Sequence, residues 1–360
     1  MAYNKNIKNL EKDLNFSDEM EVLSPEDTST LNEQRSCADL YRMYNKNQLQ
    51  LQPDFQRNFV WKPAVQTRFI DSLVKQLPIP SLCLALDYKT GKYLVIDGLQ
   101  RISTVVKFFE NNKWKLNKLS DIDANISGKS VSEIKNQSSN LYEKVENATM
   151  PVTVIKCDFS MQNHKDYLFT IFHRFNTGGQ RLNNQEIRNC IYNGNFNNLL
   201  KKIAKSEEWT NIMGKTSKID RLDNEEIILR TFAFIDKLDD YKGNLALFLN
   251  HYMSDMQHVS DMDIEEKENI LFSSLSFIYN NIDNSKSVVK LGKTLKEGLL
   301  VGLCKNIDSI ASKTKEEFQS MFQDFIEDDE FNEDNLKQGL SQKDKVKSRL
   351  RKSISIFGAL

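Results

Sequence analysis

The chain has 360 residues, with 49 basic and 50 acidic side chains. Its formal net charge of −1 excludes an overall field that would draw the whole molecule to nucleic acid or to a membrane, so any such contact must be a local patch. The length is ample for a sizeable core and predicts two domains, or one large domain with an appendage.

The five cysteines indicate a reducing compartment. They are odd in number and lack metal-ligand spacing, which argues against a disulfide framework. No stretch is apolar over the length of a membrane span, and the N-terminus is polar rather than that of a signal peptide. We therefore expect a cytoplasmic protein that has no membrane partner. The small number of prolines, 6, favours a helix-rich chain.

The first 35 residues are polar and charged, and we interpret them as a loosely ordered arm. A short helix over 37–44 and an alternating strand over 48–52 follow. Residues 53–61 are loop-like but rich in aromatic side chains, and they carry Gln56 and Arg57. Arg57 has two open interpretations: a salt-bridge partner in a packed loop, or a functional cation.

A helix is predicted to begin at Pro63, because proline is favoured in the first turn, and to end before Pro78. Residues 81–86 and 93–96 have the apolar character of buried strands and flank a turn at Gly91. These two strands should therefore form a hairpin.

The second strand of this hairpin turns directly into a helix at Asp97 and Gly98. Asp97 and Gln100 have the spacing of a capping box, which accounts for both residues without function. Arg101 fits this account less well, because a cation in the first helical turn is unfavourable by roughly 0.3–1 kcal/mol. Either Asp97 or a bound phosphate could neutralise it. A helix N-terminus beginning at glycine is also suited to an anion, so a structural cap and an anion site both stay open.

A further strand is predicted over 150–157, and an apolar helical stripe follows over 167–175. Gly178 and Gly179 would end that helix, with Arg174 and Asn176 at the mouth of the turn. Asn183 and Glu186 make another capping box, and the chain beyond about 185 is helical in pattern. His251, Asp255 and His258 fall on one helical face, as either a metal site or, more simply, a solvated surface.

Four motifs in this order resemble the N-terminal domain of GmrSD-type restriction endonucleases, a prokaryotic family with a ParB/sulfiredoxin-like core. The matching segments are 53–61, 96–101, 175–179 and 186–189, within a resemblance that covers roughly 38–250. It implies an α+β fold. A ParB/sulfiredoxin-like nucleotide-binding domain with a small mixed sheet would occupy 36–180, and a mostly α-helical domain would occupy 181–360.

The resemblance also implies a function. The family's Asp-Gly-Gln-Gln-Arg motif is tied to nucleotide binding and hydrolysis in defence against phage DNA, and it matches Asp97, Gly98, Gln100 and Arg101 here. Leu99 stands where the family usually has glutamine. Asp97, Arg101 and Arg57 would be catalytic, with Asp97 also holding Mg²⁺ beside a nucleoside triphosphate. The nucleotide-binding residues would be Gln56, Gly98, Gln100, Arg174, Asn176, Gly178 and Gly179.

The C-terminal His-Asn-His nuclease module of two-domain family members has no matching motif in this sequence. The resemblance therefore implies an NTP-hydrolysing regulatory module that works with a separate nuclease or effector. The alternative is a non-catalytic sensor or DNA-binding module that signals to such a partner. In either case we expect Gln56, Arg57, Asp97, Arg101, Arg174 and Asn176 to converge on one cleft.

Overall fold

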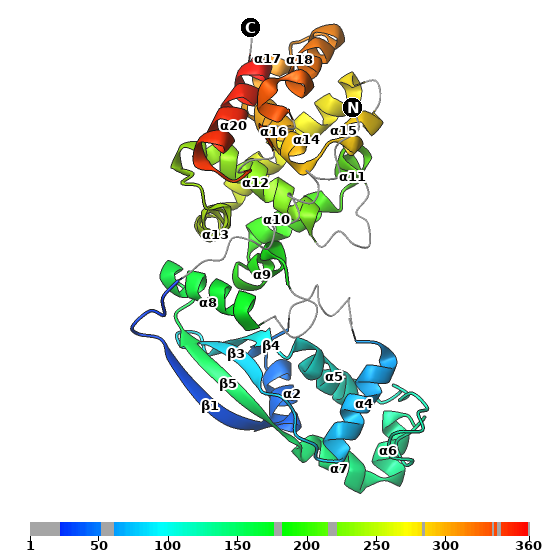
Figure 1. Ribbon diagram of the computed structural model, residues 1–360. Helices are drawn as coiled ribbons and strands as arrows, with labels where there is room; N and C mark the ends of the chain where they lie inside the picture. The colour runs from blue at the N-terminus through cyan, green and yellow to red at the C-terminus, as the bar shows by residue number, and fades with distance from the viewer. Residues whose placement is uncertain are drawn as a thin grey trace. The chain divides into compact units, whose positions relative to one another are not determined.

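The computed structural model describes residues 22–51, 61–175, 182–214, 222–282, 285–332, 335–336 and 340–358 (Figure 1). Within these ranges the chain forms two compact units, Val22–Arg181 and Leu182–Leu360. The first unit contains a sheet with helices, and the described part of the second is helical. The predicted α+β class is thus confirmed, as is the change to a mostly helical C-terminal region.

The sheet of the first unit has five strands in the order β1-β5-β3-β4-β2. Their bounds are β1 Ser29–Ser36, β2 Leu49–Gln50, β3 Leu82–Asp87, β4 Lys92–Asp97 and β5 Thr149–Cys157. Strands β3 and β4 form the predicted antiparallel hairpin. Strand β5 pairs in parallel with β3 and antiparallel with β1, while β2 pairs in parallel with β4. The sheet is therefore small and mixed, as predicted.

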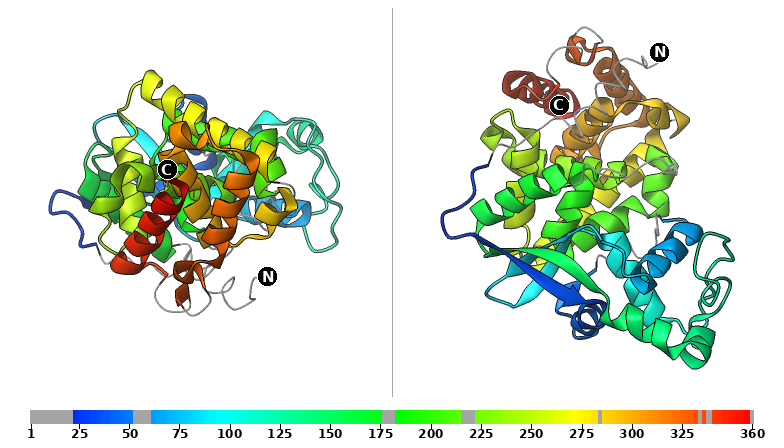
Figure 2. Two further views of the ribbon diagram at one scale, coloured as in Figure 1. Left: turned by 90° about the horizontal axis from the view of Figure 1, so that it is seen from above. Right: turned by 60° about the horizontal axis from the view of Figure 1, so that its bottom comes forward.

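Helices cover both faces of this sheet, as Figures 1 and 2 show. One face, which includes Leu84, Val95 and Val154, shares a buried core with α2 (Cys37–Asn45), α4 (Pro63–Val74), α5 (Leu99–Glu110), α6 (Val131–Gln137) and α7 (Ser139–Asn147). Helix α8 (Gln162–Phe175) contacts the sheet at β4. Because strand residues alternate between faces, apolar residues at successive positions of β3 and β4 are buried on both sides.

Strand β1 corrects the sequence-based interpretation of residues 29–35 as part of a loosely ordered arm. Its sequence, STLNEQRS, is polar at nearly every position, so hydrophobic periodicity does not reveal it. The strand forms because its backbone pairs with β5 along its full length, from Ser29 opposite Lys156 to Ser36 opposite Thr149. As an edge strand it needs little apolar burial of its own.

The second unit begins with α9 (Asn184–Ile191), α10 (Asn195–Ala204), α11 (Glu207–Met213), α12 (Asp223–Lys237), α13 (Leu245–Asp255) and α14 (Asp261–Asn281). It continues with α15 (Ser285–Lys290), α16 (Lys293–Lys305), α17 (Ile307–Ile310), α18 (Lys315–Glu327) and α20 (Lys343–Gly358). Helix α16 packs against α12 and α20. A Cβ at Gly302 would come within 2.5 Å of the Ser353 hydroxyl of α20, so glycine permits this close helix pair.

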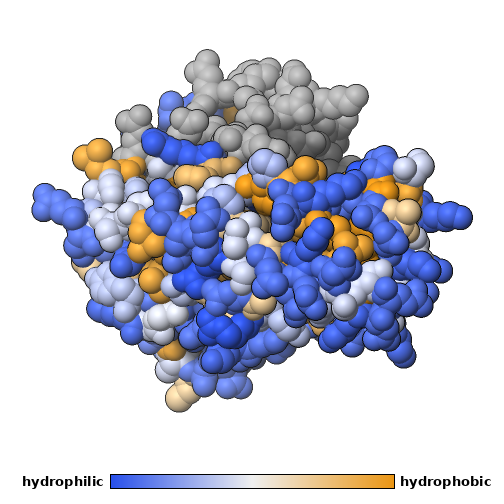
Figure 3. Space-filling model, turned by 90° about the horizontal axis from the view of Figure 1, so that it is seen from below, coloured by the Kyte–Doolittle hydropathy of each residue, from blue (hydrophilic) through white to orange (hydrophobic). Residues whose placement is uncertain are grey.

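Hydrophobic residues on the surface form separated patches among hydrophilic ones, as one face of the molecule shows in Figure 3. Such scattered exposure is ordinary for a folded chain. In the part of the chain that the structure describes, no helix combines the length and apolar character needed to cross a membrane.

Candidate functional site: the junction between β4 and α5

The junction between β4 and α5 carries four of the residues that the sequence singled out. Strand β4 ends at Asp97, and Gly98 adopts a left-handed conformation (φ 94°, ψ 11°) before α5 begins at Leu99. A Cβ at Gly98 would lie 2.2 Å from Cδ2 of Leu82 on β3. The missing side chain therefore makes room for Leu82, and the backbone conformation is one that glycine adopts without strain.

Asp97 is not the helix cap, so the predicted capping box with Gln100 is wrong. The N-cap is Gly98, which has no side chain to accept a hydrogen bond. Asp97 instead remains in the ladder opposite Cys83, and its Oδ2 lies 2.8 Å from Nη2 of Arg101. A full positive charge one helical turn away attracts the carboxylate more strongly than a neutral backbone N–H does.

Arg101 also connects α5 to the start of β3. Its Nη1 donates to the carbonyl oxygen of Pro80 and lies 3.4 Å from that of Ser81. Its side chain is 12 % exposed. Burial lowers the pKa of Arg101, while the Asp97 carboxylate opposes this effect. Asp97 thus neutralises Arg101, one of the two alternatives that the sequence left open, and the guanidinium serves as a structural clamp.

Within the described residues, no side chain caps the first turn of α5. The earliest intrahelical bond runs from the N–H of Ile102 to the carbonyl of Gly98. Among the described residues, the N–H groups of Leu99, Gln100 and Arg101 have no acceptor. Three uncapped donors and the positive end of a 12-residue helix favour negative charge at this position.

The side chain of Gln100 contacts the chain that leads into α4. Its Oε1 accepts a hydrogen bond of 3.3 Å from the N–H of Trp61, and the Trp61 carbonyl accepts one of 2.9 Å from Gln66. Trp61 follows Gln56 and Arg57 closely in sequence, but both of these residues lie outside the described part of the chain. The contact thus brings the described end of the 53–61 motif to the start of α5.

Asn176, Gly178 and Gly179 also lie outside the described residues. Arg174 is exposed in the last turn of α8, which ends at Phe175. Of the six residues expected to meet in one cleft, the structure thus joins Asp97 and Arg101. The convergence of the other four stays a prediction.

The donors at this junction fit a magnesium ion that is held mainly by phosphate and water. Asp97 is 37 % exposed, and Arg101 occupies one of its carboxylate oxygens, Oδ2. In proteins, Mg²⁺ commonly takes one or two carboxylates and completes its octahedron with substrate phosphates and water. Within the described ranges, no group of three or more His, Cys, Asp or Glu side chains could hold a metal by itself.

The His251, Asp255 and His258 set does not share one helix, so that prediction is wrong. Helix α13 ends at Asp255, and the carboxylate of Asp255 lies 2.5 Å from Nζ of Lys237. The regular spacing of the three residues is lost where the helix stops, which the sequence did not mark with proline or glycine.

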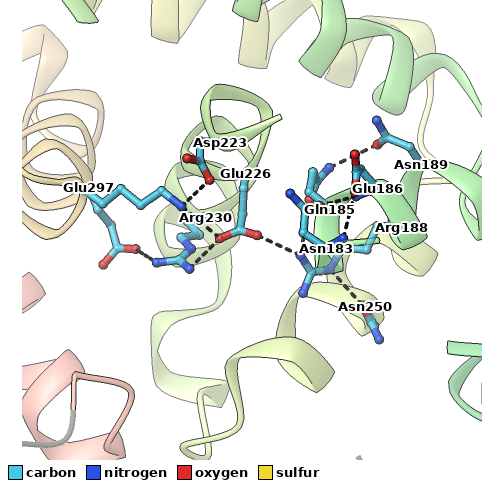
Figure 4. A network of polar contacts seen from close by, with 11 residues as sticks. Asn183, Gln185, Glu186, Arg188, Asn189, Asp223, Glu226, Arg230, Asn250 and Glu297 are labelled. Atoms are coloured by element: carbon cyan, nitrogen blue, oxygen red, sulfur yellow. Dashed lines mark hydrogen bonds and ion pairs between the residues drawn. The ribbon is translucent and has the colours of Figure 1, made fainter. Parts of the chain in front are cut away.

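A buried polar network in the second unit was not anticipated (Figure 4). The carboxylate of Glu226 on α12 lies 2.6 Å from Arg230 and 3.5 Å from Arg188 on α9. Arg188 also donates to Asn250 at 2.9 Å, and Arg230 lies 3.5 Å from Glu297 on α16. The network therefore joins four helices through side chains that are nearly all buried.

The charges of this network hold Glu226 ionised. Burial by itself would raise its pKa, but Arg230, Lys293 and Arg188 outweigh burial and lower the pKa to about 2. The i, i+4 spacing of Glu226 and Arg230 was a signal in the sequence. The partners Arg188 and Glu297 are distant in sequence, so no local pattern could have linked them. Gln185 accepts a hydrogen bond from Arg188 at 3.3 Å and donates one to Asn189 at 3.2 Å, so both positions of the last motif belong to this network.

Residues 38–193 match the family model described as "GmrSD restriction endonuclease, N-terminal domain". The match covers strands β2 to β5 but not β1, and it includes the β4–α5 junction and α9. No curated protein and no solved structure matches the chain.

Proposed function

We propose that the chain is the nucleotide-responsive regulatory module of a restriction or defence system, because residues 38–193 match the model of the GmrSD restriction endonuclease N-terminal domain. In this proposal it binds a nucleoside triphosphate with Mg²⁺ at the start of α5, hydrolyses it, and controls a separate nuclease or effector.

The uncapped first turn of α5 is the observation that carries this proposal. A phosphate there would accept hydrogen bonds from the N–H groups of Leu99, Gln100 and Arg101, at the positive end of the helix dipole. Arg101 adds a positive charge whose orientation is already set by Asp97 and the Pro80 carbonyl. A preset charge loses little conformational freedom when a ligand arrives.

The chain's own residues would take the following roles. Asp97 offers a carboxylate to the metal or to the attacking water, and Arg101 with Arg57 neutralises the charge that develops on the transferred phosphoryl group. Magnesium, when bound, supplies charge neutralisation of the phosphates. Gln56, Arg174, Asn176, Gly178 and Gly179 would complete the nucleotide site.

A substitution at Leu99 distinguishes a module that hydrolyses the nucleotide from one that only binds it. The Leu99 side chain is a hydrocarbon that packs against the core of the first unit. It has no polar atom that could hold the attacking water. If hydrolysis is only weakened by the absence of glutamine here, Leu99→Gln will raise phosphate release. If the module is a non-catalytic sensor, the same change will leave phosphate release at background while nucleotide binding persists.

The binding test uses thermal shift of the whole chain with each of the four NTPs at millimolar concentration, with and without Mg²⁺. A ligand that binds only the folded state must raise the melting temperature. Asp97→Asn keeps an acceptor for Arg101 but removes the charge, so we expect it to abolish the Mg²⁺-dependent part of the shift.

The matched control is Asp121→Asn. Asp121 pairs with Arg68 at 2.8 Å on the surface, with 54 % of its side chain exposed, so its loss should leave the ligand shifts unchanged. No shift with any NTP would refute the proposal. A full Mg²⁺-dependent shift in Asp97→Asn would remove Asp97 from the metal site.

A further inference from the structure

The linker between α9 and α10 holds the one Asn-Gly pair of the sequence, Asn193 followed by Gly194. Helix α9 ends at Ile191 and α10 begins at Asn195, so the pair lies outside regular secondary structure. Both residues are exposed. An Asn-Gly pair is chemically reactive, because the glycine nitrogen can attack the side-chain amide of asparagine with no Cβ in its way. Contacts made in the folded chain decide whether such a pair is protected.

The two groups that would react are not held by other contacts. Among the residues that the structure describes, neither the side-chain amide of Asn193 nor the backbone N–H of Gly194 has a hydrogen-bond partner. A Cβ built at Gly194 would have nothing within 4 Å, so the space beside this residue is open. The amide and the nitrogen can therefore approach each other without breaking a hydrogen bond.

A hydrogen bond from Gln257 acts on the same peptide group. Its side-chain amide donates to the backbone carbonyl of Asn193 at 3.0 Å. This carbonyl and the nitrogen of Gly194 share one delocalised peptide bond. A hydrogen bond to the carbonyl draws electron density from the nitrogen, and its proton becomes easier to remove. The contact thus favours the deprotonated nitrogen, which is the attacking nucleophile.

We propose that Asn193 is a site of spontaneous deamidation in the folded chain. The nitrogen of Gly194 loses its proton to a solvent base and forms a bond to the side-chain carbonyl carbon of Asn193. The bond from that carbon to the side-chain nitrogen breaks, and the nitrogen takes a proton from water and leaves as ammonia. Water then opens the resulting cyclic imide at either of its carbonyls. The products are aspartate and isoaspartate, and water is the only co-reactant.

The isoaspartate product changes the linker more than the aspartate product does. Its backbone passes through the former side chain, which adds a methylene group between α9 and α10. Both helices are fixed by buried side chains, because Arg188 of α9 pairs with Glu226 and Phe196 of α10 lies in the apolar core. Close-packed helices do not absorb extra length without strain. We therefore expect the isoaspartate form to melt at a lower temperature than the variant Asn193→Asp.

The Asp97–Gly98 pair serves as a comparison within the same chain, because an Asp-Gly pair can form the same cyclic imide. Here the carboxylate of Asp97 lies 2.8 Å from Nη2 of Arg101. Gly98 is also confined, since a Cβ built on it would lie 2.2 Å from Cδ2 of Leu82. We expect no isoaspartate at Asp97 under conditions that convert Asn193.

The test incubates the whole chain in mildly basic buffer beside a synthetic peptide of residues 188–198, which represents an unprotected pair. Ion-exchange chromatography separates the deamidated chain, because either product adds one negative charge. Peptide mass spectrometry then locates the changed residue, and the aspartate and isoaspartate peptides separate by reversed-phase chromatography. Asn193 in the folded chain should react at close to the rate of the peptide, and both rates should rise with pH.

Asn193→Gln is the matched control, because the longer side chain keeps the amide but disfavours ring closure, and it should form no acidic product in the same time. An intact Asn193 in the folded chain after the peptide is largely converted would overturn the proposal, since the fold would then protect the pair. Equal amounts of acidic product from Asn193→Gln would also overturn it, by locating the reaction elsewhere. If the isoaspartate form melts at the same temperature as Asn193→Asp, the expected effect of linker length is refuted.

Discussion

Replacing Gly98 with alanine tests how the β4–α5 junction is built. The residue has φ 94°, where an L-residue is strained by about 1–2 kcal/mol. The new Cβ would also lie 2.2 Å from Cδ2 of Leu82, a side chain with 0 % exposure that cannot move into solvent. Such overpacking costs about 1–3 kcal/mol. The two effects together predict a loss of about 2–5 kcal/mol in the free energy of unfolding.

Gly91→Ala is the matched control, because Gly91 lies in the β3–β4 hairpin turn with φ 70° and has nothing within 4 Å of a Cβ. It should show the backbone strain alone, about 1–2 kcal/mol. Urea unfolding followed by circular dichroism measures both variants. If Gly98→Ala destabilises no more than Gly91→Ala, the packing of Leu82 against the glycine is not what requires it, and the reasoning fails.

Two other substitutions test the polar contacts, and chemical labelling tests the burial of two cysteines. Arg101→Ala should destabilise by about 1–3 kcal/mol by urea unfolding, since it removes the ion pair with Asp97 and the hydrogen bond to the Pro80 carbonyl, both made by a side chain that is only 12 % exposed; a loss as small as that of the surface control Arg68→Ala would contradict the clamp. Glu226→Gln should destabilise by about 3–5 kcal/mol. The pKa of Glu226 in the folded chain, about 2, lies below its ordinary value of 4.5. The stabilisation from ionised Glu226 is therefore complete above pH 4.5 and is lost as the pH falls toward 2. If the free energies of unfolding of the unmodified chain and Glu226→Gln differ by a constant amount over this pH range, the argument is disproved. Burial raises the thiol pKa of Cys37 and Cys304 to about 12, so iodoacetamide at pH 8 should modify them only after unfolding, as peptide mass spectrometry would show; rapid labelling of the native chain would refute this.

Local signals in the sequence predicted much of the first unit. The apolar runs around a glycine turn predicted the β3–β4 hairpin, and Pro63 predicted the start of α4. The capping box of Asn183 and Glu186 is present in full at the start of α9. These features involve residues within a few positions of one another, so their physical causes act along the chain.

Predictions from local sequence patterns were wrong where a residue makes a contact with a part of the chain that is distant in sequence. Asp97 has the right spacing for a cap, but its carboxylate pairs with Arg101, and the carbonyl of Pro80 completes the arrangement. Gln100, expected to complete that cap, contacts Trp61 instead. Strand β1 is polar in sequence and exists because β5 pairs with it.

The sequence by itself determined the fold class, the principal helices and strands, and the motifs that match the GmrSD N-terminal domain, because periodicity, capping and turn chemistry are properties of neighbouring residues. Only the tertiary structure decided which groups those motifs contact. It placed Arg101 on Asp97, filled the space beside Gly98 with Leu82, and gathered Arg188, Glu226 and Glu297 from three helices. A buried charged side chain needs a partner of opposite charge or a hydrogen-bonding group, and that partner can be distant in sequence. Which residues become partners depends on distances in the folded chain, and a local sequence pattern does not contain this information.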